Sequence, residues 1–318
     1  KHPEELYKKI KGFDWAQILT LEHTFAVQTT VHSTHFEHSQ YVALKTKDAI
    51  VDQFYENVHK RPNVDVKEPD IKIHVHISDA DCNVFLDASG DPLFKRGYRA
   101  NTGVAPINEV LAAGMLALSG WDPSIPLVDP MCGSGTLVIE AAMIATNTPA
   151  SILRDDFGFM NWSDFDEPLW NKVKQAGLDQ MTDSKAQIFA YDKELSMVRY
   201  AEQNAAVIDL VSAINFKRKD FMHLEPPAEN GMIITNPPYD ERIQIEDNEA
   251  FYKAIGDRFK QAFQGYSAWL ISSNLSAIKR VGLRPSRKIT LFNGKLECKF
   301  LKYELYSGSK KAKYANQA

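Results

Sequence analysis

Residues 125–145 read IPLVDPMCGSGTLVIEAAMIA, and they determine which fold the second half of the chain is expected to adopt. Ile125–Val128 is a short apolar strand, Asp129–Thr136 a loop with two glycines, and Leu137–Ala145 an apolar helix. Glycines let the backbone approach a ligand closely, and the start of a helix offers free amide groups. A dinucleotide fingerprint would need glycine in place of Val138, and the Gly-Lys-Ser/Thr of a phosphate loop is absent from this stretch. The stretch therefore predicts a ligand-binding loop of another kind, with a simple tight turn as the alternative.

From residue 104 onward, short apolar strands alternate with helical patterns. The expected strands after the first are residues 188–191, 214–216, 232–235, 268–272 and a hairpin over 289–305 that turns at Asn293-Gly294. This alternation predicts an α/β fold with a mainly parallel, doubly wound (Rossmann-like) sheet, and the terminal hairpin predicts an antiparallel edge. Residues 147–185 interrupt the pattern and are rich in Asp, Trp and Phe, which indicates an inserted, partly helical excursion.

The first hundred residues have a different pattern, which predicts a small α+β module. Residues 25–31 and 71–77 alternate as strands do, 82–86 is the expected returning strand of a hairpin, and 41–58 is helical. We therefore expect two domains, residues 1–100 and residues 104–318. Eight of the nine histidines lie in the first, but their spacing lacks a pattern such as HExxH, so no metal site is expected.

Composition excludes several classes of protein. The chain has 318 residues, 44% hydrophobic and 25% charged, and no apolar run long enough to span a bilayer, so neither a membrane protein nor a disordered chain is expected. Three distant cysteines suit a reducing cytoplasm rather than a disulfide framework. The first residue is Lys, which suggests a start partway into a longer protein. A net charge of -4 argues against a wholly basic nucleic-acid wrapper, so any polyanion contact is expected to be local.

Polar residues follow the later strands at the end where open α/β sheets bind ligands. Asp192 is followed by Lys193, and its carboxylate can accept hydrogen bonds from two ribose hydroxyls. Asp220-Phe221 combines a carboxylate and an aromatic ring suited to an adenine amine and its face. Asn236-Pro237-Pro238-Tyr239 forms a stiff turn in which the amide and carbonyl oxygens can hold an exocyclic amine while the Tyr239 ring stacks on its base.

These motifs, in this order, resemble those of class I S-adenosylmethionine-dependent methyltransferases that act on exocyclic amines of nucleobases, over residues 105 to about 275. The chain is more closely similar to the THUMP-containing bacterial family of 23S rRNA guanine-N2 methyltransferases, whose members are often labelled N6-adenine DNA methylases. The stretches that carry this resemblance are Pro69–Ile71, Ser89-Gly90, Lys95–Arg99, Ala105–Ala113, Asp129–Thr136 and Asn236–Arg242.

The resemblance implies a set of functional residues and partners. The implied catalytic residues are Asn236, Pro237, Pro238 and Tyr239. The implied cofactor contacts are Pro106, Asp129, Pro130, Cys132, Gly133, Gly135, Thr136, Asp192, Lys193, Asp220, Phe221 and Asn236. The implied RNA contacts are Lys95, Arg96 and Arg99, each of which could also belong to an ordinary solvated surface. The cofactor is S-adenosylmethionine, which leaves as S-adenosylhomocysteine, with no metal. The implied partner is 23S rRNA or a ribosomal assembly intermediate, in the cytoplasm.

Two departures and three alternatives accompany this hypothesis. Met131 replaces the first glycine of the commoner loop, and a ferredoxin-like segment that precedes the THUMP module in the family is largely missing, so RNA affinity lower than that of the parent protein is expected. An N6-adenine methyltransferase acting on DNA or RNA would use the same Asn-Pro-Pro-Tyr turn, and only the THUMP-like half favours RNA. A nicotinamide oxidoreductase is disfavoured by Val138, and a non-catalytic RNA-binding module by the intact motifs.

Overall fold

The computed structural model describes residues 2–101, 106–238 and 248–306. The chain divides into two compact units, one made of Lys1–Leu93 with Arg154–Lys174 and the other of Phe94–Leu153 with Gln175–Ala318. The middle of the aromatic excursion thus returns to the first unit, where Phe157 and Phe159 pack on Trp170 with ring centroids 5.3 and 5.1 Å away. The two-domain boundaries stay a prediction.

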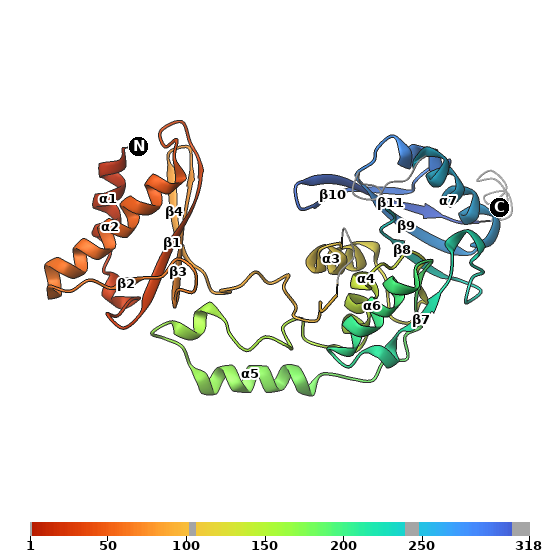
Figure 1. Ribbon diagram of the computed structural model, residues 1–318, viewed down its shortest axis with the longest axis horizontal. Coiled ribbons are helices and arrows are strands. Elements are labelled where there is room, and N and C mark those ends of the chain that lie inside the picture. Colours follow the sequence, from red (N-terminus) through yellow and green to blue (C-terminus); the bar gives the residue numbers. More distant parts are fainter. Residues whose placement is uncertain (1, 102–105, 239–247, 307–318) are drawn as a thin grey trace, which may run out of the picture. The chain divides into compact units, whose positions relative to one another are not determined.

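The first unit is a four-stranded sheet in the order β2-β1-β3-β4, with α1 and α2 on one side of it (Figure 1). Strands β1 and β3 are parallel, and β3 and β4 form the antiparallel hairpin expected from the sequence. Alternate residues of β3, from Ile71 to Ile77, face a core shared with both helices. Its elements are α1 (Pro3–Lys11), η1 (Trp15–Gln17), β1 (Thr24–His32), α2 (Ser39–Val58), β2 (Asn63–Val64), β3 (Ile71–Ser78), β4 (Asp81–Leu86) and η2 (Gly158–Asn161), with α5 (Glu167–Asp179) beginning here and ending in the second unit.

The second unit is a seven-stranded sheet in the order β10-β11-β9-β8-β5-β6-β7. The five strands β5 to β9 are parallel, and the strand order reverses between β5 and β8. The strands are β5 (Leu127–Asp129), β6 (Ile188–Asp192), β7 (Asn215–Arg218), β8 (Gly231–Thr235), β9 (Tyr266–Ser272), β10 (Arg287–Asn293) and β11 (Leu296–Glu304). The helices are α3 (Glu109–Ser119), α4 (Thr136–Ala145), α6 (Leu195–Ala206) and α7 (Asn248–Ala262), with short turns η3 (Val211–Ala213), η4 (Phe221–His223) and η5 (Ala277–Val281).

The mainly parallel α/β sheet expected from the sequence is confirmed, including the hairpin about Asn293-Gly294. The hairpin differs in one respect from the expected antiparallel edge, namely in the direction of its outer strand. The second hairpin strand, β11, inserts between β9 and β10 and is antiparallel to both, so β10 at the edge runs in the direction of the central strands. Strand β11 can occupy this inner position because its residues Cys298, Phe300 and Leu301 are apolar and buried.

Both faces of the central sheet are buried. Leu127 and Val128 are neighbours on β5 but belong to two different apolar clusters, one on each side of the sheet. The same holds for β9, where Trp269 stacks on Phe300 of β11 at 4.5 Å and Leu270 faces the other cluster. Continuous apolar strands are what a sheet covered on both faces requires.

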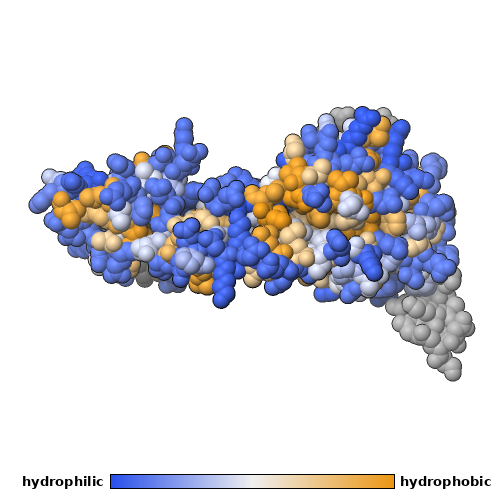
Figure 2. Space-filling model, turned by 90° about the horizontal axis from the view of Figure 1, so that it is seen from below, coloured by the Kyte–Doolittle hydropathy of each residue, from blue (hydrophilic) through white to orange (hydrophobic). Residues whose placement is uncertain are grey.

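No helix in the described ranges is both long and apolar enough to cross a membrane. The face of the molecule in Figure 2 is largely hydrophilic, with apolar patches between the polar side chains. Exposed large apolar residues of the described chain include Phe85 on β4 and Leu169 and Val173 on α5.

Candidate cofactor and target-base site

Three polar residues mark the carboxyl ends of the central parallel strands. Asp129 ends β5, Asp192 ends β6, and Thr235 ends β8, with Asn236 directly after it. Strands β6 and β8 pair with opposite sides of β5, so the three ends lie together where the strand order reverses. Ligands of open α/β sheets bind in the crevice at this point.

The loop after β5 is held to the end of β6 by hydrogen bonds. The Gly133 amide donates to Oδ2 of Asp192 at 3.0 Å, and the Cys132 amide donates to the Tyr191 carbonyl at 2.8 Å. Gly133 and Gly135 have φ angles of 54° and 87°, which favour glycine. A Cβ on Gly135 would lie 2.7 Å from the Ala201 Cβ, whereas a Cβ on Gly133 would meet nothing within 4 Å. The loop is therefore packed against α6 on one side and open at Gly133.

The amides at the start of α4 are available for a ligand. Its N-cap is Gly135, which has no side chain to bond them. Thr136, the first helical residue, is buried, and its hydroxyl accepts a hydrogen bond from Arg99 at 3.2 Å. A helix start of this kind stabilises negative charge or an acceptor group that lies beside its free amides.

Asp129 links two strand ends from inside the protein. Its carboxyl is 2% exposed, and Oδ1 accepts hydrogen bonds from the Thr235 hydroxyl at 3.0 Å and the Met131 amide at 3.2 Å. Burial, which outweighs these bonds, raises the pKa of Asp129 to about 7. The Asp129–Thr235 bond thus connects the cofactor loop directly to the strand that leads into Asn236.

Asp192 lies nearer the surface and is bound by two amides. Beside the Gly133 amide on Oδ2, the Glu194 amide donates to Oδ1 at 2.9 Å. Burial raises the pKa of Asp192, and the two amides oppose that rise because they favour the charged form. The next residue, Lys193, is exposed, and its carbonyl accepts a hydrogen bond from Arg218 at 2.9 Å.

Cys132 has the environment of an inert thiol. Its side chain is buried, with Sγ 3.6 Å from the Gly133 carbonyl, and burial raises the pKa of the thiol well above its usual value. A nucleophilic cysteine needs the opposite shift toward the thiolate. Pro130 is buried beside it, and Pro106 is exposed.

The predicted adenine contacts separate in the structure. Asp220 is exposed and caps η4 by accepting a hydrogen bond from the Met222 amide at 2.9 Å. Phe221 is 3% exposed, and its ring packs on Phe259 and Phe263 with centroids 5.7 and 5.8 Å away. The Phe221 ring therefore packs in the core, and its contact with adenine stays a prediction.

Asn236 has the one feature expected of a residue that awaits a ligand. Its side-chain Oδ1 is buried and has no hydrogen-bond partner within the described ranges. Leaving a buried oxygen unpaired costs about 1 to 3 kcal/mol, so a ligand that donates a hydrogen bond to this atom would recover that cost. Pro237 is buried and Pro238 half-buried, and Tyr239 lies outside the described residues.

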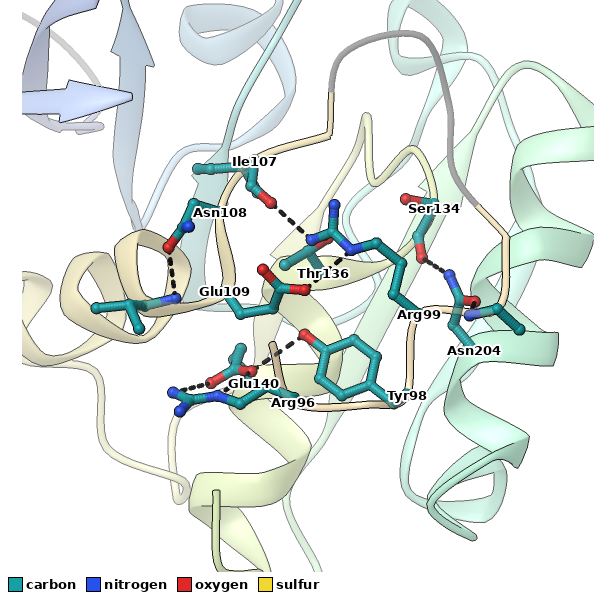
Figure 3. A network of polar contacts seen from close by, with 12 residues as sticks. Arg96, Tyr98, Arg99, Ile107, Asn108, Glu109, Ser134, Thr136, Glu140 and Asn204 are labelled. Carbon is teal, nitrogen blue, oxygen red and sulfur yellow. Dashed lines mark hydrogen bonds and ion pairs between the residues drawn. The ribbon is translucent and has the colours of Figure 1, made fainter. Parts of the chain in front are cut away.

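The basic residues predicted to contact RNA lie in a segment that we call the strap, residues 94–101. Arg96 forms an ion pair with Glu140 of α4 at 3.3 Å, and Arg99 forms one with Glu109 of α3 at 3.0 Å (Figure 3). The Arg99 guanidinium also donates to the Ile107 carbonyl at 2.8 Å. Arg96 and Arg99 are thus mostly buried in internal contacts, and their contact with RNA stays a prediction. Lys95 is exposed.

Sequence reasoning missed the acidic partners of the strap. Glu140 is 3% exposed, and its Oε1 also accepts a hydrogen bond from the Tyr98 hydroxyl at 3.0 Å (Figure 3). Burial raises the pKa of Glu140, whereas the Arg96 guanidinium lowers it. A single carboxylate within the apolar helix TLVIEAAMIA is a signal that could have revealed this contact, because a buried charge requires a partner.

A metal centre finds no support in the geometry. Within the described ranges no group of three or more His, Cys, Asp or Glu side chains is placed to hold a metal ion. The absence of a metal from the reaction nevertheless remains a prediction.

Known proteins resemble the chain over nearly all of its length. A protein of Synechocystis sp. named as a candidate RNA methyltransferase is 39% identical over 305 residues, which are 95% of this chain and 79% of that protein. The ribosomal RNA large subunit methyltransferase K/L of Syntrophotalea carbinolica is 34% identical over 95% of this chain. The match covers only 44% of that relative, so the chain spans less than half of its length.

Solved structures also resemble the chain over nearly all of its length. A possible methylase from Clostridium difficile 630 has a TM-score of 0.87 at 30% identity and matches 98% of this chain and 82% of its own. A candidate methyltransferase, SMU.472, crystallised with S-adenosylhomocysteine, has a TM-score of 0.85 at 30% identity over 96% of this chain and 81% of its own. A Listeria monocytogenes protein described as a predicted N6-adenine-specific DNA methylase has a TM-score of 0.83 at 28% identity over 95% of this chain and 79% of its own.

The fold and the loop after β5 define an S-adenosylmethionine-dependent methyltransferase of the Rossmann-like class. The RMKL-like methyltransferase domain matches residues 96–302, and a THUMP domain matches residues 1–87. The chain belongs to the THUMP-containing RMKL-like methyltransferase family, as its resemblance to the rRNA methyltransferases implied.

Proposed function

We propose that this chain transfers a methyl group from S-adenosylmethionine to the exocyclic N2 amine of a guanine in 23S rRNA. The observation that carries the proposal is the buried Oδ1 of Asn236 just after β8, which has no hydrogen-bond partner among residues 2–101, 106–238 and 248–306 and lies beside the strand end that bears the cofactor loop. The K/L relatives, whose name assigns them to large-subunit ribosomal RNA, support the choice of RNA.

The residues around the loop fit the cofactor. Gly133 leaves open space where a side chain would stand, and the uncapped start of α4 presents amides to it. Asp192 would accept the ribose hydroxyls, and Asp220, exposed at the end of β7, would accept the adenine amine. The loop itself would be shaped by residues beside its cofactor-facing side, namely Asp129, Pro130, Cys132, Gly135 and Thr136. The exposed residues Pro106 and Lys193 would lie at the edge of the site. The cofactor supplies an electrophilic methyl group on a sulfonium.

The amine would be held by the turn after β8. The guanine N2 lone pair is delocalised into the ring, so this nitrogen is a poor nucleophile until it becomes pyramidal. Oδ1 of Asn236 and the Pro237 carbonyl would accept hydrogen bonds from its two N–H groups and direct the lone pair at the methyl group. The new N–C bond would form as the bond between the methyl group and the sulfonium breaks, and the methylated nitrogen would release one proton to solvent. Pro238 keeps the turn stiff, and Tyr239 would stack on the base. In such a transfer, orientation contributes more than acid-base catalysis.

The substrate would reach this site as a base turned out of its stack. An enzyme that modifies a base edge must extrude the nucleotide or bind a single strand. The THUMP domain is the unit that implies RNA as the substrate, and Lys95 stays a proposed RNA contact. The enzyme would meet 23S rRNA or a ribosomal assembly intermediate in the cytoplasm, a reducing compartment that suits its three free cysteines.

N6-adenine methylation is the second candidate function. The same oxygens would hold an adenine N6 amine, and the related Listeria monocytogenes structure is described as an N6-adenine-specific DNA methylase. The THUMP domain favours RNA. Mass spectrometry of nucleosides from rRNA reacted with the purified protein separates the two, because N2-methylguanosine supports our proposal and N6-methyladenosine supports the alternative.

The catalytic role of Asn236 is tested by Asn236→Ala. We expect turnover to fall about 100-fold or more, equivalent to about 2.7 kcal/mol of transition-state stabilisation, because one preorganised polar group is removed from the reacting centre. Melting temperature and cofactor affinity should stay close to those of the unmodified protein. The measurements are methyl transfer by mass spectrometry, calorimetric titration and thermal unfolding.

Asn274→Ala is the matched control. Asn274 follows the neighbouring strand β9, but its Oδ1 is used within its own turn, where it accepts from the Ala277 amide at 2.9 Å and the Ser276 hydroxyl at 2.8 Å. Its loss should lower the melting temperature and leave turnover per folded molecule close to normal. A fully active Asn236→Ala enzyme would contradict the proposed mechanism.

A further inference from the structure

Asn204 of α6 connects two separate segments of the second unit through a single buried side chain. Its Oδ1 accepts hydrogen bonds from the amides of Ala100 and Asn101 in the strap, both at 3.0 Å. Its Nδ2 donates to the carbonyls of Ser134 and Asn101, both at 2.9 Å. The residue is 1% exposed, and Figure 3 shows its amide between the strap and Ser134. All four hydrogen-bonding positions of the side chain are thus occupied.

The Ser134 carbonyl lies at a sensitive point of the cofactor loop. Ser134 stands between Gly133 and Gly135, the two residues with positive φ. One turn earlier on α6, Ala201 packs against Gly135 so closely that no side chain fits there. Helix α6 therefore fixes the loop at two successive residues, by packing at Gly135 and by a hydrogen bond at Ser134.

The strap also contacts the start of α4, next to the cofactor loop. Arg99, next to Ala100, donates to the Thr136 hydroxyl at the first residue of α4. Removing the Asn204 amide would leave the buried Ser134 carbonyl and the amides of Ala100 and Asn101, which lie nearer the surface, without these partners. Buried backbone groups are strongly selected to be paired, so the loop at Ser134 would have to rearrange, and the two strap amides would lose the contact that holds them on α6.

We propose that Asn204 is a positioning residue that couples docking of the strap to the ligand-binding shape of the cofactor loop. The Gly133–Asp192 hydrogen bond and the start of α4 keep their observed geometry only while Ala100 and Asn101 are docked on Asn204. This rests on the proposed function in one respect, because it takes the loop after β5 to be the cofactor site. Coupling of this kind is reciprocal, so cofactor binding also stabilises the strap.

The first test needs no variant. Hydrogen exchange of the amides of Ala100 and Asn101 is followed by NMR in the whole protein, with and without S-adenosylhomocysteine. We expect saturation to slow their exchange about fivefold or more, within the range of usual coupling energies. Unchanged exchange at both amides, in a protein that binds S-adenosylhomocysteine, would overturn the inference.

The second test compares three variants. Asn204→Asp keeps the acceptor but places an oxygen against the Ser134 and Asn101 carbonyls, and Asn204→Ala removes both roles. Gln203→Ala is the control, because exposed Gln203 contacts the same strap by a single bond from Asn101 Nδ2 at 2.8 Å. We expect the Kd for S-adenosylhomocysteine and the KM for S-adenosylmethionine to rise about tenfold or more in the Asn204 variants, with kcat at saturation within about threefold.

The outcomes separate this inference from the proposed function. Gln203→Ala should bind like the unmodified protein, and a folded Asn204→Asp that does so would overturn the coupling. A lower kcat with unchanged KM would assign Asn204 to another step and also overturn it. If the unmodified, folded protein fails to bind S-adenosylhomocysteine, the proposed function itself fails. If the variants do not fold, the exchange experiment on the unmodified chain decides.

Discussion

Asp129 and Asp192 end neighbouring strands of one sheet, yet their surroundings give them different tasks. Asp129 is enclosed and uses Oδ1 to bind Met131 and Thr235, so it organises the protein itself. Asp192 is only half-buried and bonds the Gly133 and Glu194 amides from the edge of the crevice. Asp129 thus holds the loop and the end of β8 together inside the protein, whereas Asp192 is a candidate ligand contact.

At the residue scale, Asp192→Ala should weaken binding of S-adenosylmethionine by about 1 to 3 kcal/mol, the cost of losing a charge-assisted hydrogen bond to the ribose. Isothermal titration calorimetry checks this. Glu194→Ala is the control, because Glu194 is exposed and makes no side-chain cap on α6. Equal affinities for all three proteins would remove Asp192 from the cofactor site.

Asp129 should give stability a pH dependence of definite sign. Its pKa is raised from 3.8 to about 7 on folding, so the folded state holds a proton that the unfolded state has lost between these values. The contribution of Asp129 to the free energy of unfolding is fully present below about pH 4 and is lost as pH rises from there through about 7. It changes by at most about 1.4 kcal/mol per pH unit. Asp129→Asn cannot titrate, and its amide oxygen can still accept from Thr235 and Met131.

We therefore expect the free energy of unfolding of Asp129→Asn to increase relative to that of the unmodified protein as pH rises from about 4 to about 7. Urea denaturation at several pH values measures this difference. A difference that does not vary with pH would show that the Asp129 carboxyl is already ionised in the folded protein at low pH.

At the scale of elements, helices α3 and α7 each contain a glycine in a different environment. A Cβ added to Gly256 of α7 would lie 1.8 Å from the Val281 carbonyl oxygen of η5, so the two elements touch at this point. A Cβ added to Gly114 of α3 would meet nothing within 4 Å. The first glycine permits a close backbone approach, and the second only loosens its helix.

Gly256→Ala should therefore destabilise the protein by about 1 to 3 kcal/mol through overpacking against η5. Gly114→Ala should instead stabilise it by about 0.4 to 1 kcal/mol, because alanine restricts the unfolded chain and favours the helix. Chemical denaturation of both variants measures these changes. Loss of stability in both would mean that backbone approach does not distinguish the two positions.

At the scale of the whole molecule, each unit has a hydrophobic cluster of its own. The first is built around Phe25, Ile50 and Ile73, and the second has clusters on both sides of its sheet, around Leu127 and Val128. A unit with its own core can unfold as a cooperative element. The proposed cofactor residues all belong to the second unit.

Calorimetry should thus resolve two unfolding transitions, of which S-adenosylhomocysteine shifts one. At a ligand concentration about 100 times the Kd, the second unit should gain about 2.7 kcal/mol, while the transition of the first unit stays in place. Proteolysis with mass spectrometry at intermediate temperatures assigns each transition. An equal shift of both would show that the units unfold together.

The local elements and their order could be predicted from the amino-acid pattern alone. Period-two alternation identified β3, and the glycine loop after Val128 identified the start of α4, because such signals depend on neighbouring residues alone. Polar residues at the ends of β5, β6 and β8 could be expected to meet, because carboxyl ends of parallel strands share one edge. The family resemblance followed from the same motifs.

The tertiary structure alone decided which of those residues face inward. Arg96 and Arg99 have the sequence of a basic surface patch, but Glu140 and Glu109, which approach from two helices, neutralise them inside the protein. Phe221 belongs to the core because Phe259 and Phe263 of a later segment surround it. Asn204, within an ordinary helix, gains its four partners from segments about 70 and 100 residues away. Burial and pairing depend on what distant segments bring to a site, and no local pattern contains that information.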